Sequence, residues 1–323
     1  MLYQFGRMLV NLSLKLYCRD VKINTTEFFK TEEPLLLAVN HPNSFLDAII
    51  LCTLFDKPVY SLTRGDVFKG KFITKLLRSI KMLPVYRVSE GVENLDSNYK
   101  TFKECTDILK QNGIVLIFSE GRCENEWHLR PLKKGTARLA ITAWEQNIPV
   151  KVLPVGMNYS SFYLFGKNLR INFGSPIERK DLTTGINDNG RLLNELTGTV
   201  QQQLQKLVYE IDAGDLQTRK EKFNLPVSNF KKVLLSMPAI LGILIHWPVY
   251  IPLKNFIAKK TTKTGHYDSV IVGLIVLGYP FYMLLWCLIV YLTIGGYWGW
   301  SVFILLPFFA WCYVQIKPQM ENR

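Results

Sequence analysis

The sequence has no pair of cysteines at the spacing that a zinc site or a disulfide framework requires. The cysteines are scattered along the chain, at Cys18, Cys52, Cys105, Cys123, Cys287 and Cys312. Isolated cysteines of this kind are typical of proteins in a reducing compartment. We therefore expect reduced thiols on the cytoplasmic side and no disulfide framework.

A second absence is that of charge near the end of the chain. Residues 269–316 contain no Asp, Glu, Lys or Arg. The segment is long enough for two membrane-spanning helices of about 20 residues each, and Gly295 and Gly296 interrupt it. The preceding stretch, 233–253, is apolar but contains several prolines, which favours a kinked interfacial or re-entrant segment as much as a clean span. Lysines flank the uncharged segment on both sides, so the positive-inside rule places both flanks and the preceding domain in the cytoplasm.

The common signatures of nucleotide and nucleic-acid binding are also missing. The chain has no P-loop, no dinucleotide-binding fingerprint, no zinc-finger spacing and no basic region followed by heptads. The net charge is nevertheless +13, from 39 Lys and Arg against 26 Asp and Glu. So basic a balance favours an anionic partner. In a chain with a membrane segment, an anionic lipid bilayer is the simplest such partner, and we expect no nucleic acid.

No covalent nucleophile stands out. The G-x-S-x-G turn of serine hydrolases is absent, and no Ser or Cys occupies an obvious nucleophile position. The simplest remaining chemistry is direct attack by a substrate hydroxyl that a protein base deprotonates.

What the sequence does contain is an alternation of apolar runs and helical stretches. Apolar runs predict buried strands at 35–39, 59–62, 82–86, 114–118 and 151–155, with a further strand at 169–173. Helical stretches lie between them, at 45–55, 71–80, 95–111 and 135–147. This alternation predicts an α/β fold with a mostly parallel sheet flanked by helices.

The composition divides the chain into four parts. Residues 1–25 are expected to form an interfacial part whose residues 1–22 are an amphipathic helix that lies in the membrane interface. The alternative is that this helix packs on the following domain. The α/β domain is expected at 26–215 and a charged linker at 216–232. The membrane region, 233–323, is expected to hold about two transmembrane helices and the proline-containing segment.

The most informative segment, 40–47, directly follows the first predicted strand and reads NHPNSFLD. It brings His41 and Asp47 close together. Histidine is the usual general base near neutral pH, and an aspartate is its usual orienting partner. The alternative is structural, because Ser44 and Asp47 fit a capping box that closes the first turn of a helix. A turn that folds the imidazole back over the helix would let Asp47 close the first helical turn and orient His41 at the same time.

Charged residues follow two further predicted strands. Arg87 follows the third strand, and Glu120, Gly121 and Arg122 follow the fourth. In an open parallel sheet, ligands bind beyond the carboxyl ends of the strands. Arginine suits phosphate because its planar fork donates two hydrogen bonds, and glycine lets backbone and ligand approach closely. The sequence thus predicts a base and an anion site at one edge of the sheet, with solvated surface charge as the alternative for each arginine.

Four segments in order resemble the motif blocks of the glycerolipid acyltransferase superfamily, which includes lysophosphatidic acid and glycerol-3-phosphate acyltransferases. The first block is the His–Asp pair of 40–47, and the second is the short strand that ends before Arg87. The third block, FPEGTRS in the family, corresponds to FSEGRC at 118–123, and the fourth centres on the proline of VLPV at 152–155. The His–Asp spacing is one residue longer than usual, and the third block lacks its threonine.

The resemblance implies transfer of a fatty acyl chain from acyl-CoA or acyl carrier protein to a hydroxyl of a glycerol phosphate, with no metal or redox cofactor. It implies that His41 is the general base and that Asp47 orients it. The acceptor phosphate would be bound around Arg87, Glu120, Gly121, Arg122 and Arg64.

The resemblance leaves the acceptor open. The first candidate is 1-acylglycerol-3-phosphate (lysophosphatidate), which would give phosphatidate for phospholipid synthesis. The longer His–Asp spacing keeps glycerol-3-phosphate as a rival, and an amino-acid lipid would make less use of a phosphate site. A non-catalytic lipid-binding membrane protein is the alternative from another class, and the intact pair of His41 and Asp47 argues against it.

Overall fold

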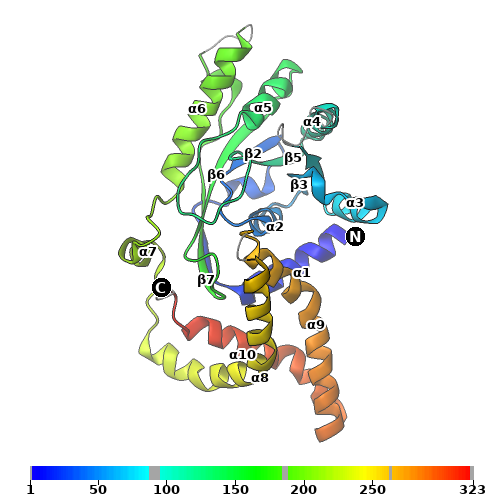
Figure 1. Cartoon of the computed structure of the whole chain (residues 1–323), viewed down its shortest axis with the longest axis vertical. Helices are drawn as coiled ribbons and strands as arrows, with labels where there is room; N and C mark the ends of the chain where they lie inside the picture. Colours follow the sequence, from blue (N-terminus) through cyan, green and yellow to red (C-terminus); the bar gives the residue numbers. More distant parts are fainter. Residues whose placement is uncertain (1, 87–94, 184–187, 262–263, 321–323) are drawn as a thin grey trace.

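The computed structural model of the chain describes residues 2–86, 95–183, 188–261 and 264–320. Its centre is a seven-stranded sheet with the strand order β1-β7-β6-β2-β5-β3-β4 (Figure 1). The strands are β1 (Cys18–Ile23), β2 (Leu35–Val39), β3 (Val59–Arg64), β4 (Met82–Val85), β5 (Ile114–Phe118), β6 (Lys151–Tyr159) and β7 (Lys167–Phe173). The α-helices are α1 (Leu2–Tyr17), α2 (Phe45–Leu54), α3 (Gly70–Ser79), α4 (Leu95–Lys110), α5 (Gly135–Glu145), α6 (Asn189–Leu207), α7 (Leu216–Phe223), α8 (Asn229–Thr261), α9 (Tyr267–Ile294) and α10 (Val302–Ile316).

The strands β6, β2, β5, β3 and β4 are all parallel to one another. Their carboxyl ends therefore meet at one edge of the sheet, where Val39 of β2 lies opposite Phe118 of β5 and Val155 of β6. Strand β7 is antiparallel to β6 and parallel to β1, so these two strands begin at the edge where the others end. The predicted fold, a mostly parallel sheet flanked by helices, is confirmed.

The two faces of the sheet are buried against different helices. In β2, Leu35, Leu37 and Val39 belong to a core shared with α1 and α2. The alternate residues Leu36 and Ala38 belong to a core shared with α4, α5 and α6. Burial on both faces explains why the strand is an unbroken apolar run in the sequence.

The first segment of the chain differs from expectation. Helix α1 ends at Tyr17, and residues 18–22, predicted to continue the helix, lie in strand β1 beside β7. The prediction was wrong there because the charged residues Arg19, Asp20 and Lys22 resemble the polar end of an amphipathic helix, whereas they belong to an edge strand.

Helix α1 packs on the α/β domain and also exposes apolar side chains. Arg7 turns inward and donates a hydrogen bond of 3.2 Å to the carbonyl of Thr53 on α2. Phe5, Met8 and Leu12 are exposed. An exposed apolar face is what an interfacial helix needs, and the interfacial placement of α1 stays a prediction.

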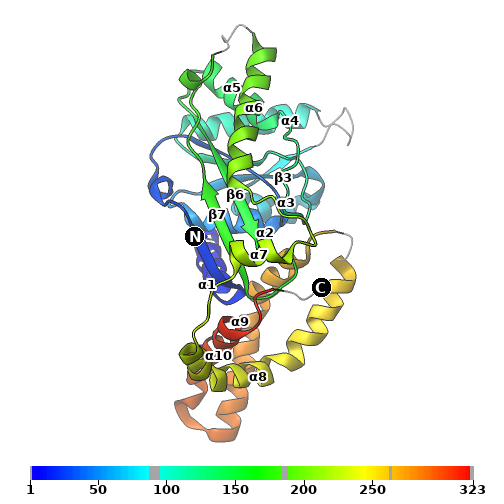
Figure 2. The same cartoon turned by 90° about the vertical axis from the view of Figure 1, so that its left-hand side faces the viewer.

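Helices α8, α9 and α10 gather at one end of the molecule, below the sheet (Figures 1 and 2). Among the residues that the structure describes, three helical segments are long and apolar enough to cross a membrane, namely α8, α9 and the segment Gly296–Ile316 that ends in α10. Helix α8 runs through its prolines without a break and bends along its length, so the stretch 233–253 is part of one kinked helix. Gly295, with a φ of 78°, ends α9 where the sequence predicts an interruption.

The stretch 216–232, expected to be a charged linker, contains helix α7. Asp215 caps this helix by accepting the N–H of Thr218 at 2.9 Å. Phe223 at its end is fully buried beside Ile211 and Met320. Helix α7 therefore packs against residues that follow both α6 and α10.

Candidate active site

The side chain of Asn40 extends the central ladder of the sheet by one position. Its Nδ2 donates to the carbonyl of Met157 at 3.1 Å, and its Oδ1 accepts the N–H of Met157 at 2.7 Å. The side-chain amide of Asn40 thus makes the same two hydrogen bonds to β6 that the backbone of one more residue of β2 would make. It fixes the start of the loop 40–44, which carries His41 into α2.

His41 and Asp47 lie together. Nδ1 of His41 is 3.0 Å from Oδ2 of Asp47. The Asp47 side chain is fully buried, whereas 17% of the His41 side chain is exposed. Because an ionised carboxylate only accepts hydrogen bonds, Nδ1 carries the proton and Nε2 is the basic nitrogen. This is the arrangement of a base that a ligand can reach, oriented by a carboxylate behind it.

The capping box that the sequence allows is not formed. Ser44 is the N-cap of α2, but its side chain makes no capping hydrogen bond. Its Oγ lies 2.5 Å from Nδ1 of His266 instead. Asp47 accepts the N–H of Asn43 at 2.8 Å, ahead of the helix. The carboxylate therefore closes the turn at Asn43 and orients His41 at the same time.

A tyrosine at the end of β6 completes the surroundings of Asp47. The hydroxyl of Tyr159 donates a hydrogen bond of 2.7 Å to Oδ1 of Asp47. Both carboxylate oxygens thus accept hydrogen bonds, as a buried charge requires. Burial and the neighbouring carboxylate raise the pKa of the Tyr159 hydroxyl, so it remains a donor at neutral pH.

The His41 ring is also held from one side. It stacks on Phe118, the last residue of β5, with ring centroids 3.7 Å apart and planes inclined by 11°. The stacking and the hydrogen bond at Nδ1 together leave the imidazole little rotational freedom, which favours a reaction that needs one orientation.

Glu120 follows β5 and orders the backbone beside the imidazole. Its Oε2 accepts the N–H of His41 at 3.1 Å, and its Oε1 accepts the N–H of Arg130 at 3.3 Å. Burial raises the pKa of the Glu120 carboxyl to about 7, against the opposing effect of these two hydrogen bonds. The carboxyl therefore keeps its proton at a higher pH than a solvent-exposed glutamate does.

Gly121 is required by the turn itself. Its φ is +74°, and a Cβ at this position would lie 3.0 Å from Cγ of Lys133. Its N–H donates to the carbonyl of Phe118 at 3.1 Å, which closes a tight turn after β5. The left-handed backbone alone explains the glycine.

Arg122 is connected to the His41 loop through Glu124. Its Nε is 3.3 Å from Glu124, and both side chains are exposed. The N–H of Glu124 donates to the carbonyl of His41 at 3.2 Å. Arg87, which was also predicted to bind phosphate, lies outside the described residues.

His266 lies near enough to Arg64 and His41 for their charges to interact. Arg64 is the last residue of β3, and its exposed guanidinium pairs with Asp66. Burial, and then the charges of Arg64 and His41, lower the pKa of His266. No sequence pattern indicated that His266 lies here, because it belongs to the basic segment before α9.

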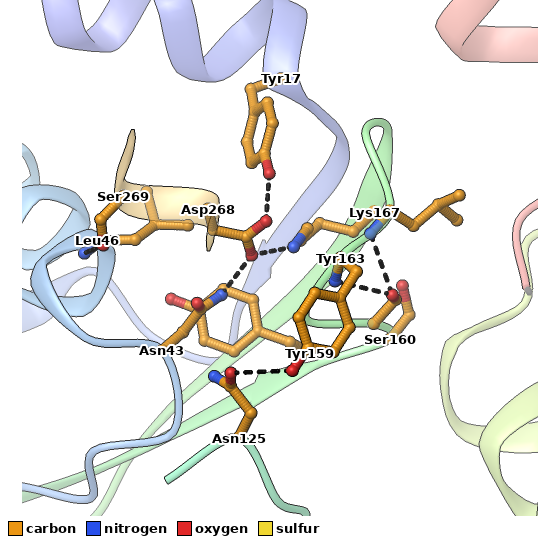
Figure 3. Close-up of polar contacts among 12 residues, drawn as sticks. Tyr17, Asn43, Leu46, Asn125, Tyr159, Ser160, Tyr163, Lys167, Asp268 and Ser269 are labelled. Atoms are coloured by element: carbon orange, nitrogen blue, oxygen red, sulfur yellow. Dashed lines mark hydrogen bonds and ion pairs between the residues drawn. The ribbon is translucent and has the colours of Figure 1, made fainter. Parts of the chain in front are cut away.

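Sequence reasoning also missed a buried ion pair beside the loop. Oδ2 of Asp268 accepts hydrogen bonds from Nζ of Lys167 and, at 2.6 Å, from Nδ2 of Asn43, while Oδ1 accepts from the hydroxyl of Tyr17 (Figure 3). The Asp268 and Lys167 side chains are fully buried. A signal existed, since Asp268 immediately precedes the uncharged run 269–316 and a carboxylate there needs a partner.

Residues 20–158 match the model of the family described as Acyltransferase. Glycerol-3-phosphate O-acyltransferase 1 of Saccharomyces cerevisiae is 32% identical to this chain over 105 residues, which are 31% of this chain and 14% of the yeast protein. Glycerol-3-phosphate O-acyltransferase 2 of the same yeast is 26% identical over 177 residues, which are 52% of this chain and 24% of the yeast protein. The chain thus covers only a small part of the length of these relatives.

Among solved structures, the chain is similar to the crystal structure of the 1-acyl-sn-glycerophosphate acyltransferase PlsC from Thermotoga maritima. The TM-score is 0.46 and the sequence identity 14%, over 62% of this chain and 77% of that one. The family match spans all four sequence blocks that predicted it, from the loop 40–47 to the strand at 152–155. The match to the Acyltransferase family over residues 20–158 thus supports the resemblance to the glycerolipid acyltransferase superfamily that these blocks predicted.

Proposed function

We propose that this chain is a membrane-bound O-acyltransferase, which transfers a fatty acyl chain from acyl-CoA or acyl carrier protein to a hydroxyl of a glycerol phosphate. The observation that supports it most is the 3.0 Å contact between Nδ1 of His41 and Oδ2 of Asp47. The pair lies at the carboxyl edge of the parallel strands, inside the region that matches the acyltransferase family. Ligands of open α/β sheets bind at this edge.

In this proposal His41 is the general base and Asp47 orients it. Nε2 takes the proton of the acceptor hydroxyl while the hydroxyl oxygen attacks the carbonyl carbon of the thioester. Asp47 stabilises the imidazolium that forms. The tetrahedral intermediate then collapses, the C–S bond breaks, and Nε2 gives its proton to the departing thiolate. The products are a glycerol ester and a free thiol, and His41 returns to its starting state.

The acceptor phosphate is proposed to bind at the same edge of the sheet. The side chains and backbone proposed to surround it belong to Arg87, Glu120, Gly121, Arg122 and Arg64. Arg122 and Arg64 are exposed, and each pairs with one surface carboxylate. Such pairs are weak, so either guanidinium can turn to a phosphate, which offers more charge and more acceptor oxygens.

Two acceptors have support from different observations. Lysophosphatidate is favoured by the position of the site, because Ser44 contacts His266 directly ahead of α9, a helix able to cross a membrane. A lipid held in the bilayer would present its headgroup there. Glycerol-3-phosphate is favoured by the names of the two yeast relatives.

The membrane arrangement is part of the proposal. Lys260 and Lys317 flank the segment that contains α9 and α10, so the positive-inside rule places the α/β domain on the cytoplasmic face. The net charge of +13 suits an anionic bilayer surface. The proposed parts are an interfacial helix (α1), an acyltransferase domain that begins with β1 and extends to residue 215, a connecting segment at 216–232 that contains α7, and a membrane region at 233–323.

An acyl-transfer assay with the full chain in lipid nanodiscs tests the proposal. Labelled acyl-CoA and acyl carrier protein are each offered with glycerol-3-phosphate and with lysophosphatidate, and the products are separated by mass. We expect phosphatidate from lysophosphatidate with at least one donor. If glycerol-3-phosphate gives a product and lysophosphatidate gives none, glycerol-3-phosphate replaces lysophosphatidate as the proposed acceptor. If no donor gives an ester with either acceptor, the proposal fails and a non-catalytic lipid-binding protein takes its place.

A further inference from the structure

The loop that carries the His41–Asp47 pair is bonded to the residues at the start of α9. Nδ2 of Asn43 donates to Oδ2 of Asp268 at 2.6 Å. Adjacent contacts join Oγ of Ser44 to Nδ1 of His266 at 2.5 Å and the N–H of Leu46 to Oγ of Ser269 at 3.2 Å. Three contacts thus link the end of the loop and the start of α2, residues 43–46, to the segment 266–269, although about two-thirds of the chain lies between them.

Asp268 is the fixed point of this contact. It lies in the first turn of α9, where the helix dipole favours a carboxylate. Lys167 at the start of β7 neutralises it, and Tyr17 at the end of α1 donates to its other oxygen (Figure 3). With both ionic side chains fully buried, Asp268 cannot exchange these partners for water. Its position is therefore set by the sheet, and it in turn sets the position of Asn43.

The contact reaches the candidate base in two steps. Asn43 is bonded to Asp268 by its side chain and to Oδ2 of Asp47 by its backbone N–H, at 2.8 Å. The same Oδ2 atom holds Nδ1 of His41. Ser44, the next residue, has a φ of +54°, a left-handed backbone conformation that residues other than glycine rarely adopt. A strained residue of this kind persists only where its surroundings hold it, and the contact of Ser44 with His266 does so.

We infer that the first turn of α9 positions the catalytic loop, with Asp268 acting through Asn43 on the His41–Asp47 pair. The inference rests on the proposed acyl transfer. It makes Asp268 a positioning residue, because it touches neither the imidazole nor a reacting atom. It also couples the membrane region to catalysis, since the loop has its productive geometry only when α9 is seated against the sheet.

The variant Asn43→Ala tests the inference, because it keeps the backbone N–H to Asp47 and removes only the contact with Asp268. We expect kcat to fall by roughly 10- to 100-fold, as for a slightly misplaced reacting group, while KM for donor and acceptor stays within about twofold. The matched control is Tyr279→Phe. It removes a hydrogen bond of 3.0 Å between α9 and His246 of α8, away from the loop, and should leave kcat unchanged.

A mutant cycle separates positioning from a general effect on stability. The variant Lys167→Met with Asp268→Ala removes both buried charges together, so that no unpaired charge remains. If Asp268 acts through Asn43, adding Asn43→Ala to this variant causes no further loss of kcat. Losses that multiply, or a wild-type kcat in folded Asn43→Ala protein, would overturn the inference.

Hydrogen exchange gives a readout that does not depend on activity. We expect faster amide exchange across 43–47 in Asn43→Ala, and not in Tyr279→Phe, because the loop loses its contact with α9. Unchanged exchange in this peptide would contradict the positioning role even in a protein that transfers no acyl chain. If the wild type transfers no acyl chain but exchange across 43–47 is still faster in Asn43→Ala than in the wild type, the proposed function is refuted and the contact with α9 is established.

Discussion

The hydroxyl of Tyr159 donates a hydrogen bond of 2.7 Å to Oδ1 of Asp47, across 112 positions of sequence. Tyr159 is the last residue of β6, and both side chains are fully buried. The carboxylate is thus held between the tyrosine on one oxygen and Asn43 and His41 on the other. The sheet, and not only the loop, therefore sets the direction in which Asp47 faces the imidazole.

Replacing Tyr159 by Phe removes this hydrogen bond with little change of shape. One buried oxygen of Asp47 is then unpaired, which costs about 1–3 kcal/mol of stability. We expect kcat to fall roughly tenfold, because the imidazole is less well oriented. Kinetics and thermal unfolding in one detergent measure both effects. Tyr209→Phe, at a ring that packs on Phe223, is the control, and equal behaviour of the two variants would argue against a role of Tyr159.

Glu120 predicts a pH dependence of stability. Its pKa is raised from 4.5 to about 7 by burial, so the folded protein holds this proton more tightly than the unfolded chain does. The contribution of Glu120 therefore falls as pH rises from about 5 to about 8, by roughly 2–3 kcal/mol for a shift of this size.

The variant Glu120→Gln isolates this contribution, because it stays neutral at every pH. The Tm of the wild type relative to that of Glu120→Gln should decrease steadily as pH rises across this interval. A constant difference, or one that changes in favour of the wild type, would show that the carboxyl is not held in the protonated form.

Much of the fold could be predicted from the sequence. Strands such as β2 and β5 are buried on both faces, so each is a short unbroken apolar run between helical stretches. Strand β1 was missed because it is a half-exposed edge strand with alternating charges. Helix α8 was left ambiguous, because proline breaks a helical ladder locally and only the packing of the whole segment decides whether the helix continues.

The candidate site divides in the same way. His41 and Glu120 were identified because each follows a predicted strand directly, and parallel strands bring such residues to one edge. Tyr159, Lys167 and Asp268 were not identified, because their roles depend on contacts across 112, 101 and 225 positions. No local pattern carries that information.

Arg122 is expected to act on substrate binding and not on stability. Its ion pair with Glu124 is exposed, and such pairs contribute about 0–1 kcal/mol. Arg122→Ala should raise KM for the phosphorylated acceptor by roughly tenfold while kcat and Tm change little. Arg138→Ala, which removes an exposed arginine on α5, is the control. An unchanged KM would place the phosphate elsewhere.

Gly121 is expected to resist substitution. At a φ of +74°, an alanine would adopt a left-handed conformation and press on Lys133, at a cost of about 1–2 kcal/mol. Gly198→Ala, at a helical position of α6 with open space around it, should instead stabilise by up to about 1 kcal/mol. Denaturant unfolding compares the two, and equal signs would contradict the account of the turn.

The turnover of His41→Ala tests the central claim most directly. In nanodiscs, with acyl-CoA or acyl carrier protein and the acceptor that the wild type uses, kcat should fall by about 100- to 10,000-fold, the range for loss of a general base. Unfolding should stay close to that of the wild type, and His128→Ala, at an exposed histidine paired with Glu210, should keep full activity. A folded His41→Ala protein that transfers the acyl chain at the wild-type rate would contradict the account.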